Sequence, residues 1–160
     1  MSQLERSPRR WVLLASLAVV LGIGGWAYLV PGPSQLAAEQ DIVVYKSPTC
    51  GCCEDWVVHL RREGFEVVPH DQIDMNAIKT RFGVPGELAS CHTATVANYV
   101  VEGHVPGDVI TRMLKERPPI TGLAVPGMPG GSPGMESAPK VPYSVIAFDA
   151  AGTQSPYESR

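Results

Sequence analysis

Three of the four cysteines in this chain fall within four positions, in the run Cys50-Gly51-Cys52-Cys53. Residues 42–45, immediately upstream, are β-branched and aromatic, and such a run predicts a short buried strand. Downstream, Trp56 and Leu60 recur at helical spacing until Gly64, which is typical of the residue that follows a helix. The cysteines are therefore predicted on a tight turn that leads from a strand into a helix.

This position favours sulfur chemistry. The first turn of a helix presents unpaired backbone N–H groups and a partial positive charge, which stabilise a thiolate, and the thiolate is both the nucleophile and the metal ligand. Cys50 and Cys53 form a C-x-x-C pair, as in redox motifs, whereas Cys52 adds a neighbour that ordinary redox motifs lack. The spacing leaves two uses open, a redox disulfide with a spare cysteine or three sulfurs that converge on a soft metal ion.

The elements predicted after the cysteine turn continue to alternate. The pattern predicts strands at 41–46, 65–68, 93–96, 99–101 and 143–148, and helices at 52–63, at 75–82 after the capping residue Asp74, and after Pro106. Such alternation favours a parallel strand pair with a right-handed crossover. The order predicts an α/β domain that resembles the thioredoxin fold, with a central mixed β-sheet of about four or five strands flanked by helices.

The N-terminus carries an export signal. Three arginines precede an uncharged apolar run at 11–30, which is long enough to span a bilayer, and a Pro/Gly segment ends it. The prediction is a signal or inner-membrane anchor helix at 1–30, a linker at 31–40, a domain at 41–150 outside the cytoplasm, and a polar tail at 151–160. The segment is either retained as an anchor or cleaved as a signal peptide, and a periplasmic location follows in both cases.

The charge of the chain excludes one class of partner. The formal net charge is −3, with no basic patch in the sequence, so we expect no nucleic-acid binding. An exported domain also meets an oxidising compartment, where exposed cysteines become disulfides unless a metal or a reductant holds them.

The fourth cysteine lies in a position that the thioredoxin resemblance makes informative. In that fold, the loop before the third strand packs against the C-x-x-C turn and usually carries a proline, but here Cys91 stands at that place. The resemblance therefore implies a fourth sulfur beside the first three. His92 is either a further ligand or a partner that orients Cys91. For His104, between a glycine and a valine-proline pair, we favour a turn histidine bonded to backbone over a ligand.

Four short runs carry a more specific resemblance, namely Cys50-Gly51-Cys52-Cys53, Ser90-Cys91-His92-Thr93-Ala94, Glu102-Gly103-His104-Val105-Pro106 and Gly122-Leu123-Ala124-Val125-Pro126-Gly127-Met128-Pro129. Together they resemble the CopG-like family of small bacterial copper-resistance proteins, whose domain was long catalogued as one of unknown function. The resemblance covers about residues 41–150. It implies a thioredoxin-like fold, a periplasmic setting, copper bound by the clustered cysteines and a role in copper redox handling.

A Gly/Pro-rich loop supplies two methionines, Met128 and Met135, without the apolar periodicity of a core face. Thioether sulfur is a soft ligand that suits Cu(I) and needs no deprotonation. We interpret the loop as a lid that shields or relays copper.

The sequence thus supports a cell-envelope protein that holds Cu(I) on Cys50, Cys52, Cys53 and Cys91, with copper ions, and possible exporters or periplasmic carriers of copper, as partners. Zinc is the weaker candidate, because C-x-C-C lacks the paired spacing of structural zinc sites. The alternative is a periplasmic thiol–disulfide oxidoreductase that uses Cys50 and Cys53. Whether the protein is an enzyme stays open, with a copper oxidoreductase as the reaction class to consider.

Overall fold

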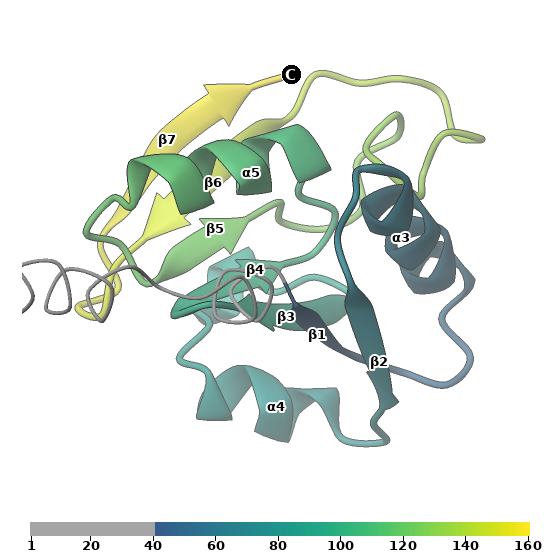
Figure 1. The fold of residues 1–160 in the computed structure, drawn as a ribbon, viewed down its shortest axis with the longest axis horizontal. Helices are drawn as coiled ribbons and strands as arrows, with labels where there is room; N and C mark the ends of the chain where they lie inside the picture. The colour runs from purple at the N-terminus through teal and green to yellow at the C-terminus, as the bar shows by residue number, and fades with distance from the viewer. Residues whose placement is uncertain (1–40) are drawn as a thin grey trace, which may run out of the picture. The chain divides into compact units, whose positions relative to one another are not determined.

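The computed structural model describes residues 41–160, so the predicted helix at 1–30 and the linker at 31–40 lie outside the described residues. The described chain forms a mixed α/β domain built on one sheet (Figure 1). Its elements are β1 (Ile42–Lys46), α3 (Gly51–Arg62), β2 (Val67–Asp71), α4 (Met75–Arg81), the 3-10 turn η1 (Gly86–Leu88), β3 (His92–Val96), β4 (Tyr99–Glu102), α5 (Gly107–Glu116), β5 (Gly122–Ala124), β6 (Ser144–Phe148) and β7 (Gln154–Ser159). Within residues 41–160 no helix has both the length and the apolar character that crossing a membrane requires.

The sheet has seven strands in the order β2-β1-β3-β4-β5-β6-β7. The predicted parallel pair is confirmed, since β1 and β2 run parallel with α3 as the crossover between them. The strands predicted at 93–96 and 99–101, whose separation by Ala97 and Asn98 predicts a hairpin, are confirmed as the antiparallel pair β3 and β4, with Ala97 in a left-handed conformation in the turn. The mixed character of the sheet is therefore as expected.

The prediction of four or five strands is wrong, because the sheet has seven, and residues 154–159 of the predicted polar tail form one of the two additional strands. β5 has only three residues and pairs parallel to β4, while β7 lies antiparallel to β6 at the sheet edge. β7 contains Pro156 and is largely exposed, and an edge strand tolerates both features. Such a strand lacks the alternation of apolar and polar residues by which strands are recognised from sequence. β2 also begins two residues later than predicted.

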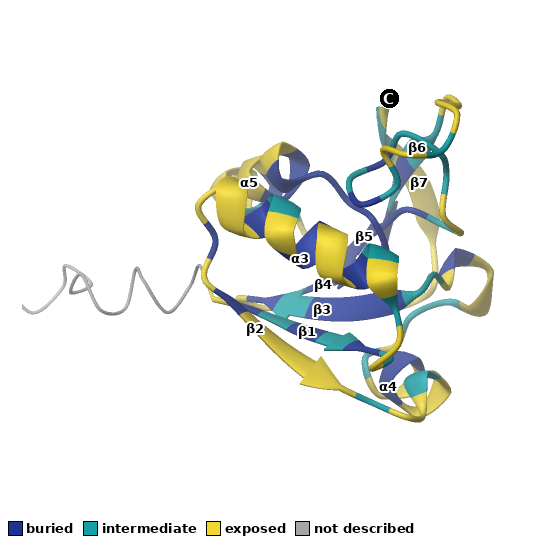
Figure 2. Cartoon of the chain, turned by 90° about the vertical axis from the view of Figure 1, so that its right-hand side faces the viewer, coloured by how far each residue is buried: buried dark blue, intermediate teal, exposed yellow. Residues whose placement is uncertain are grey.

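Helices cover both faces of the sheet (Figure 1). On one face, α3 and α5 contribute the larger core: Trp56, Val57 and Leu60 of α3 and Ile110 and Met113 of α5 have no exposed surface. On the other face, η1 and the segment that follows α4 contribute Leu88, Phe82 and Val84 to a smaller apolar group around Phe148. The exposed side of α3 faces solvent along its length, whereas its buried stripe faces the sheet (Figure 2). This packing fixes the helix, and with it the cysteine turn at its N-terminal end.

Local sequence signals explain the helix ends. The carboxylate of Asp74 accepts a hydrogen bond from the backbone N–H of Ala77, which is the predicted N-cap of α4. Gly64 follows α3 with a φ of +91°, a conformation that favours glycine. These two predictions are confirmed.

Candidate metal centre

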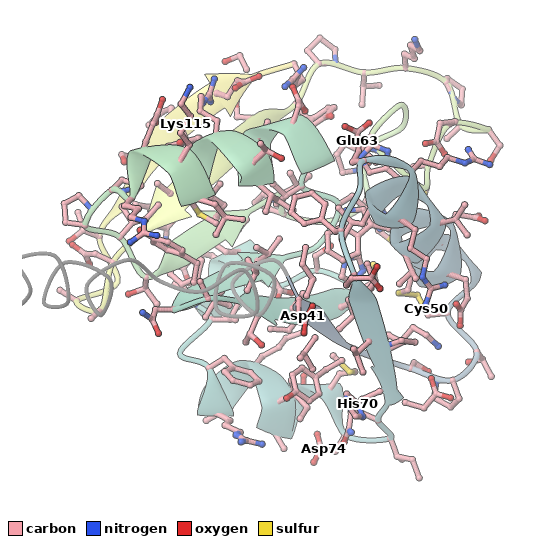
Figure 3. The ribbon with its side chains drawn as sticks, in the orientation of Figure 1. Asp41, Cys50, Glu63, His70, Asp74 and Lys115 are labelled. Carbon is pink, nitrogen blue, oxygen red and sulfur yellow. A yellow bond between two sulfur atoms is a disulfide. The ribbon has the colours of Figure 1, made fainter. Side chains whose placement is uncertain are left out.

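The cysteine turn has the predicted position between β1 and α3. Cys50 is the N-cap of α3 with an extended backbone, and Cys52 and Cys53 lie in the first helical turn. Cys50 lies at the N-terminal end of α3 (Figure 3). Cys50 and Cys53 form a disulfide, whereas Cys52 is a free thiol 3.6 Å from the Cys50 sulfur. Cys53 is fully buried, so the half-buried Cys50 is the more accessible sulfur of the pair.

Strand register brings Cys91 to this turn. β3 pairs antiparallel with β1, and His92 lies opposite Lys46, the last residue of β1. Cys91 comes immediately before His92, so it lies next to the loop that leads from β1 into the cysteine turn. The four sulfur atoms all lie within 4.8 Å of one another. We refer to these four residues, Cys50, Cys52, Cys53 and Cys91, as the four-cysteine cluster.

Both histidines near Cys91 contact its sulfur. The Cys91 Sγ atom is 2.9 Å from Nε2 of His104 and 3.3 Å from Nδ1 of His92. Nδ1 of His104 donates a hydrogen bond to the carbonyl oxygen of Pro133, at 2.7 Å, because a carbonyl can only accept. That bond leaves Nε2 of His104 without a proton, so its lone pair points at Cys91 and accepts from the thiol. The expected backbone contact of His104 is therefore present, together with a contact to sulfur.

The protonation states of the cluster follow from burial. Burial, followed by the nearness of Cys52, raises the pKa of the Cys91 thiol to about 12. Burial lowers the pKa of His92 and of His104, and the charge of Lys79, together with that of His104 in its protonated form, further lowers the pKa of His92. At neutral pH the site therefore holds a protonated Cys91 thiol between two neutral imidazoles. A bound cation would displace the thiol proton, as metal binding to cysteine requires.

The loop at 126–139 closes over this centre. Met128 places its Sδ 3.8 Å from the sulfur of Cys52 and is 53 % exposed, so it lies at the solvent side of the cluster. Ser90 Oγ donates to the carbonyl of Gly127, which ties the loop to the segment that carries Cys91. Gly134 has a φ of +84°, and a Cβ there would lie 2.6 Å from the Cys52 carbonyl oxygen, so only glycine allows this approach. Met135 contributes to the loop through backbone bonds with Gly131, Ser132 and Ala138.

A buried ion pair behind the centre escaped sequence reasoning. Glu102 has no exposed surface, and its Oε1 accepts from Lys79 Nζ at 2.5 Å and from the Ser90 backbone N–H at 2.6 Å. Its Oε2 accepts from Thr93 Oγ1 at 2.7 Å. One carboxylate thus holds the residues on both sides of the Cys91–His92 pair. In the sequence, the one sign of this buried ion pair was that a charged residue, Glu102, ends the otherwise apolar run 99–102.

A second ion-pair group fixes the other side of the turn. Lys46, buried at the end of β1, contacts the carboxylates of Glu54 in the first turn of α3 and Asp71 at the end of β2, each at 2.6 Å. Trp56 packs against the His92 ring at a tilt of 38°, with centroids 4.3 Å apart, and donates to the Val105 carbonyl. The start of α3 and the start of β3 are therefore held together by side chains as well as by the sheet.

The two remaining histidines lie outside the centre. His70 is exposed on β2 and stacks on Tyr45 (Figure 3). His59 accepts a hydrogen bond from the Gly107 backbone N–H at 3.1 Å, which joins α3 to the start of α5. Its place with Asp55 and Arg62 on the polar face of α3 predicts a solvated surface residue, and this contact and the partial burial of His59 show that the prediction is wrong.

Comparison with known proteins places these features in context. Two solved structures, both of a copper resistance protein copG and labelled Form 1 and Form 2, match the chain with 43 % identity and a TM-score of 0.71. Each match covers 75 % of this chain, and 97 % of the Form 2 chain or 96 % of the Form 1 chain. A family model described as "Protein of unknown function, DUF411" matches residues 88–135, which include Cys91, His104, Met128 and Met135. No match was found among curated proteins.

Proposed function

The chain belongs to the CopG-like family, and from that membership we propose that it is a cell-envelope copper-binding protein that holds Cu(I) on the four-cysteine cluster. The observation that carries the proposal is the approach of all four sulfurs to within 4.8 Å of one another. Thiolates are soft ligands that select Cu(I), and their sulfurs can bridge more than one ion. The thioredoxin-like arrangement, with the cysteine turn after the first strand, is part of the same proposal.

His92 and His104 serve this site as partners of Cys91. Each imidazole faces the Cys91 sulfur, and the bond from His104 to the Pro133 carbonyl fixes the orientation of that ring. Such outer contacts orient a ligand and raise metal affinity. Met128 lies at the solvent side of Cys52 and supplies a thioether where copper would enter or leave.

The Cys50–Cys53 disulfide gives the site a redox role within this proposal. Oxidation of the two thiols to the disulfide releases two electrons and two protons, which balances the reduction of two Cu(II) ions to two Cu(I) ions. The disulfide must be reduced again before all four sulfurs can bind copper. A periplasmic dithiol is the chemical class of reductant that could do this by exchange at the half-buried Cys50.

Metal analysis tests the copper proposal directly. The chain is reduced, handled anaerobically, incubated with excess Cu(I) or Zn²⁺, and desalted before the metal per chain is measured. We expect Cu(I) to be retained in preference to zinc. Copper-free protein that reduces disulfide substrates would instead support the alternative, a thiol–disulfide oxidoreductase, for which the accessible Cys50 and buried Cys53 are the specific observation.

Location in the periplasm is also a proposal, because the apolar segment at 11–30 lies outside the described residues. We expect the domain to be exported and either released or held at the inner membrane, where copper exporters and copper carriers would be its partners. A reporter fused after Arg160 that is active only in the periplasm is the expected result. A fusion active only in the cytoplasm would rule out export.

Replacing Met128 with leucine is expected to weaken Cu(I) retention about threefold to tenfold, a free-energy change of about 1 kcal/mol. Leucine keeps the bulk of the side chain but removes the soft sulfur that contacts Cys52. The melting temperature should stay unchanged, because this side chain is 53 % exposed. Competition with a Cu(I) chelator measures the effect.

Met135→Leu is the matched control, since the loop bonds of Met135 come from its backbone. An equal effect of both substitutions would assign copper contacts to both methionines. Unchanged copper retention with a lower melting temperature in Met128→Leu would show that Met128 is a packing residue.

A further inference from the structure

The disulfide state leaves a second group of metal-binding atoms intact. Formation of the Cys50–Cys53 bond removes two of the four cluster thiols, but Cys91 stays free. Cys91, His92 and His104 each offer one ligand atom, and these atoms lie within 4.8 Å of one another. This group contains one thiol and two imidazoles, a donor set that differs from the four sulfurs of the reduced cluster.

The geometry of this group is close to that of a bound ion. With metal–sulfur and metal–nitrogen bonds of about 2.3 and 2.0 Å, tetrahedral ligation separates sulfur from nitrogen by about 3.5 Å. The observed separations from the Cys91 sulfur are 3.3 Å to His92 and 2.9 Å to His104. Movements of a few tenths of an ångström would therefore admit an ion among the three atoms.

The surroundings of the two rings also fit ligation. His104 donates from Nδ1 to the Pro133 carbonyl, the kind of second contact that metal-binding histidines make. His92 is fully buried and turns Nδ1 toward the Cys91 sulfur, at 3.3 Å, so Nδ1 is the nitrogen that would bind an ion, while Nε2 has no hydrogen-bond partner within residues 41–160. A buried polar atom without a partner is costly, so fold stability alone does not explain an imidazole at this place.

We propose that the disulfide form of this protein binds one borderline divalent ion, of the Zn²⁺, Co²⁺ or Cu²⁺ class, on Cys91, His92 and His104. Mixed thiolate and imidazole ligation suits such ions better than it suits a multinuclear Cu(I) cluster. Three protein ligands leave a fourth position for water, as in open zinc sites. The thiol–disulfide state of Cys50 and Cys53 then selects which ion the same centre holds.

Cobalt is the probe of choice because Co²⁺ does not oxidise thiols. The protein is prepared with the Cys50–Cys53 disulfide formed, checked by counting two free thiols per chain in the described region, and titrated anaerobically with Co²⁺. The expected result is a single tetrahedral Co²⁺ per chain with a sulfur-to-cobalt charge-transfer band, which Zn²⁺ displaces. The absence of that band in correctly oxidised protein overturns the proposal.

Histidine variants assign the ligands. His104→Gln and His92→Gln should each weaken Co²⁺ binding by about tenfold or more. His70→Gln, at an exposed histidine on β2, is the matched control and should leave the titration unchanged. Because buried His92 contacts Trp56, its variant is first checked for a native circular dichroism spectrum, and the His104 variant alone suffices if that check fails. Unchanged binding in His104→Gln overturns the site.

A cysteine variant separates this inference from the copper proposal, with which it shares Cys91. Cys52→Ser removes a thiol from the four-cysteine cluster but none from the mixed site. It should lower Cu(I) binding by the reduced protein and retain Co²⁺ binding by the disulfide form. Loss of the cobalt band in this variant would show that the ion lies on Cys52 and Cys91 and would contradict the mixed site, whatever the outcome for Cu(I).

Discussion

Cys91→Ser is expected to reduce the Cu(I) retained by the reduced protein to less than about half of the native amount, because a hydroxyl is a poor ligand for a soft ion. Cys91 is distant from the other three cysteines in sequence, yet its sulfur lies within 4.8 Å of theirs. When one bridging sulfur of a four-cysteine cluster is removed, the cluster should lose more than a quarter of its bound copper, because a bridge holds more than one ion. Copper per chain after anaerobic reconstitution and desalting measures the effect.

The same substitution separates the two functions. A C-x-x-C oxidoreductase depends on Cys50 and Cys53 and should tolerate Cys91→Ser. Cys52→Ser is measured alongside, since Cys52 also lies outside the disulfide. If both variants retain the native amount of copper, and only Cys50→Ser or Cys53→Ser abolishes activity on disulfide substrates, the copper proposal should be dropped.

Lys79→Met is expected to destabilise the reduced, metal-free protein by about 3–5 kcal/mol, the usual cost of leaving a buried charge without its partner. Lys79 is the cation beside the fully buried Glu102 carboxylate, 2.5 Å away. Removal of the cation leaves that carboxylate with the Ser90 N–H and the Thr93 hydroxyl as its remaining donors among residues 41–160. Equilibrium unfolding in denaturant, with reductant present, measures the free energy.

Two further variants test the cause of this effect. Lys115→Met, at an exposed lysine of α5 (Figure 3), should change stability by less than about 0.5 kcal/mol. The double variant Lys79→Met/Glu102→Gln removes both charges and should recover part of the lost stability. A cost below about 1 kcal/mol for Lys79→Met would show that Glu102 is not held as a buried charge.

Local patterns predicted most of the elements. The strand, turn and helix around Cys50, the N-cap at Asp74 and the hairpin turn at Ala97 all follow from neighbours within a few residues, where spacing and backbone preference act. β5 and β7 were missed for the opposite reason. β5 is very short, and β7 is exposed, so both form because an adjacent strand offers hydrogen bonds to them.

In the candidate site, too, some features could be predicted from the local sequence and others depend on contacts between distant segments. Its sulfur-rich character could be predicted from Cys50, Cys52 and Cys53 alone, and the resemblance to a known family implied that Cys91 would join them. The contacts of His104 with Cys91 and Pro133 could not be predicted, because they join segments far apart in the chain. The anchoring of Ser90 and Thr93 by Glu102 depends likewise on the pairing of β3 with β4.

The donor types, and the turn that presents three of them, could be predicted from the sequence alone, because helix and strand preferences act over a few neighbouring residues. Which donors meet depends on how the chain folds. The register of β1 with β3 brings Cys91 to the turn, and closure of the loop at 126–139 brings Met128 to Cys52 and Pro133 to His104. The physical reason is that register and loop closure depend on the packing of the whole sheet, so residues separated by dozens of positions become neighbours only when the core forms.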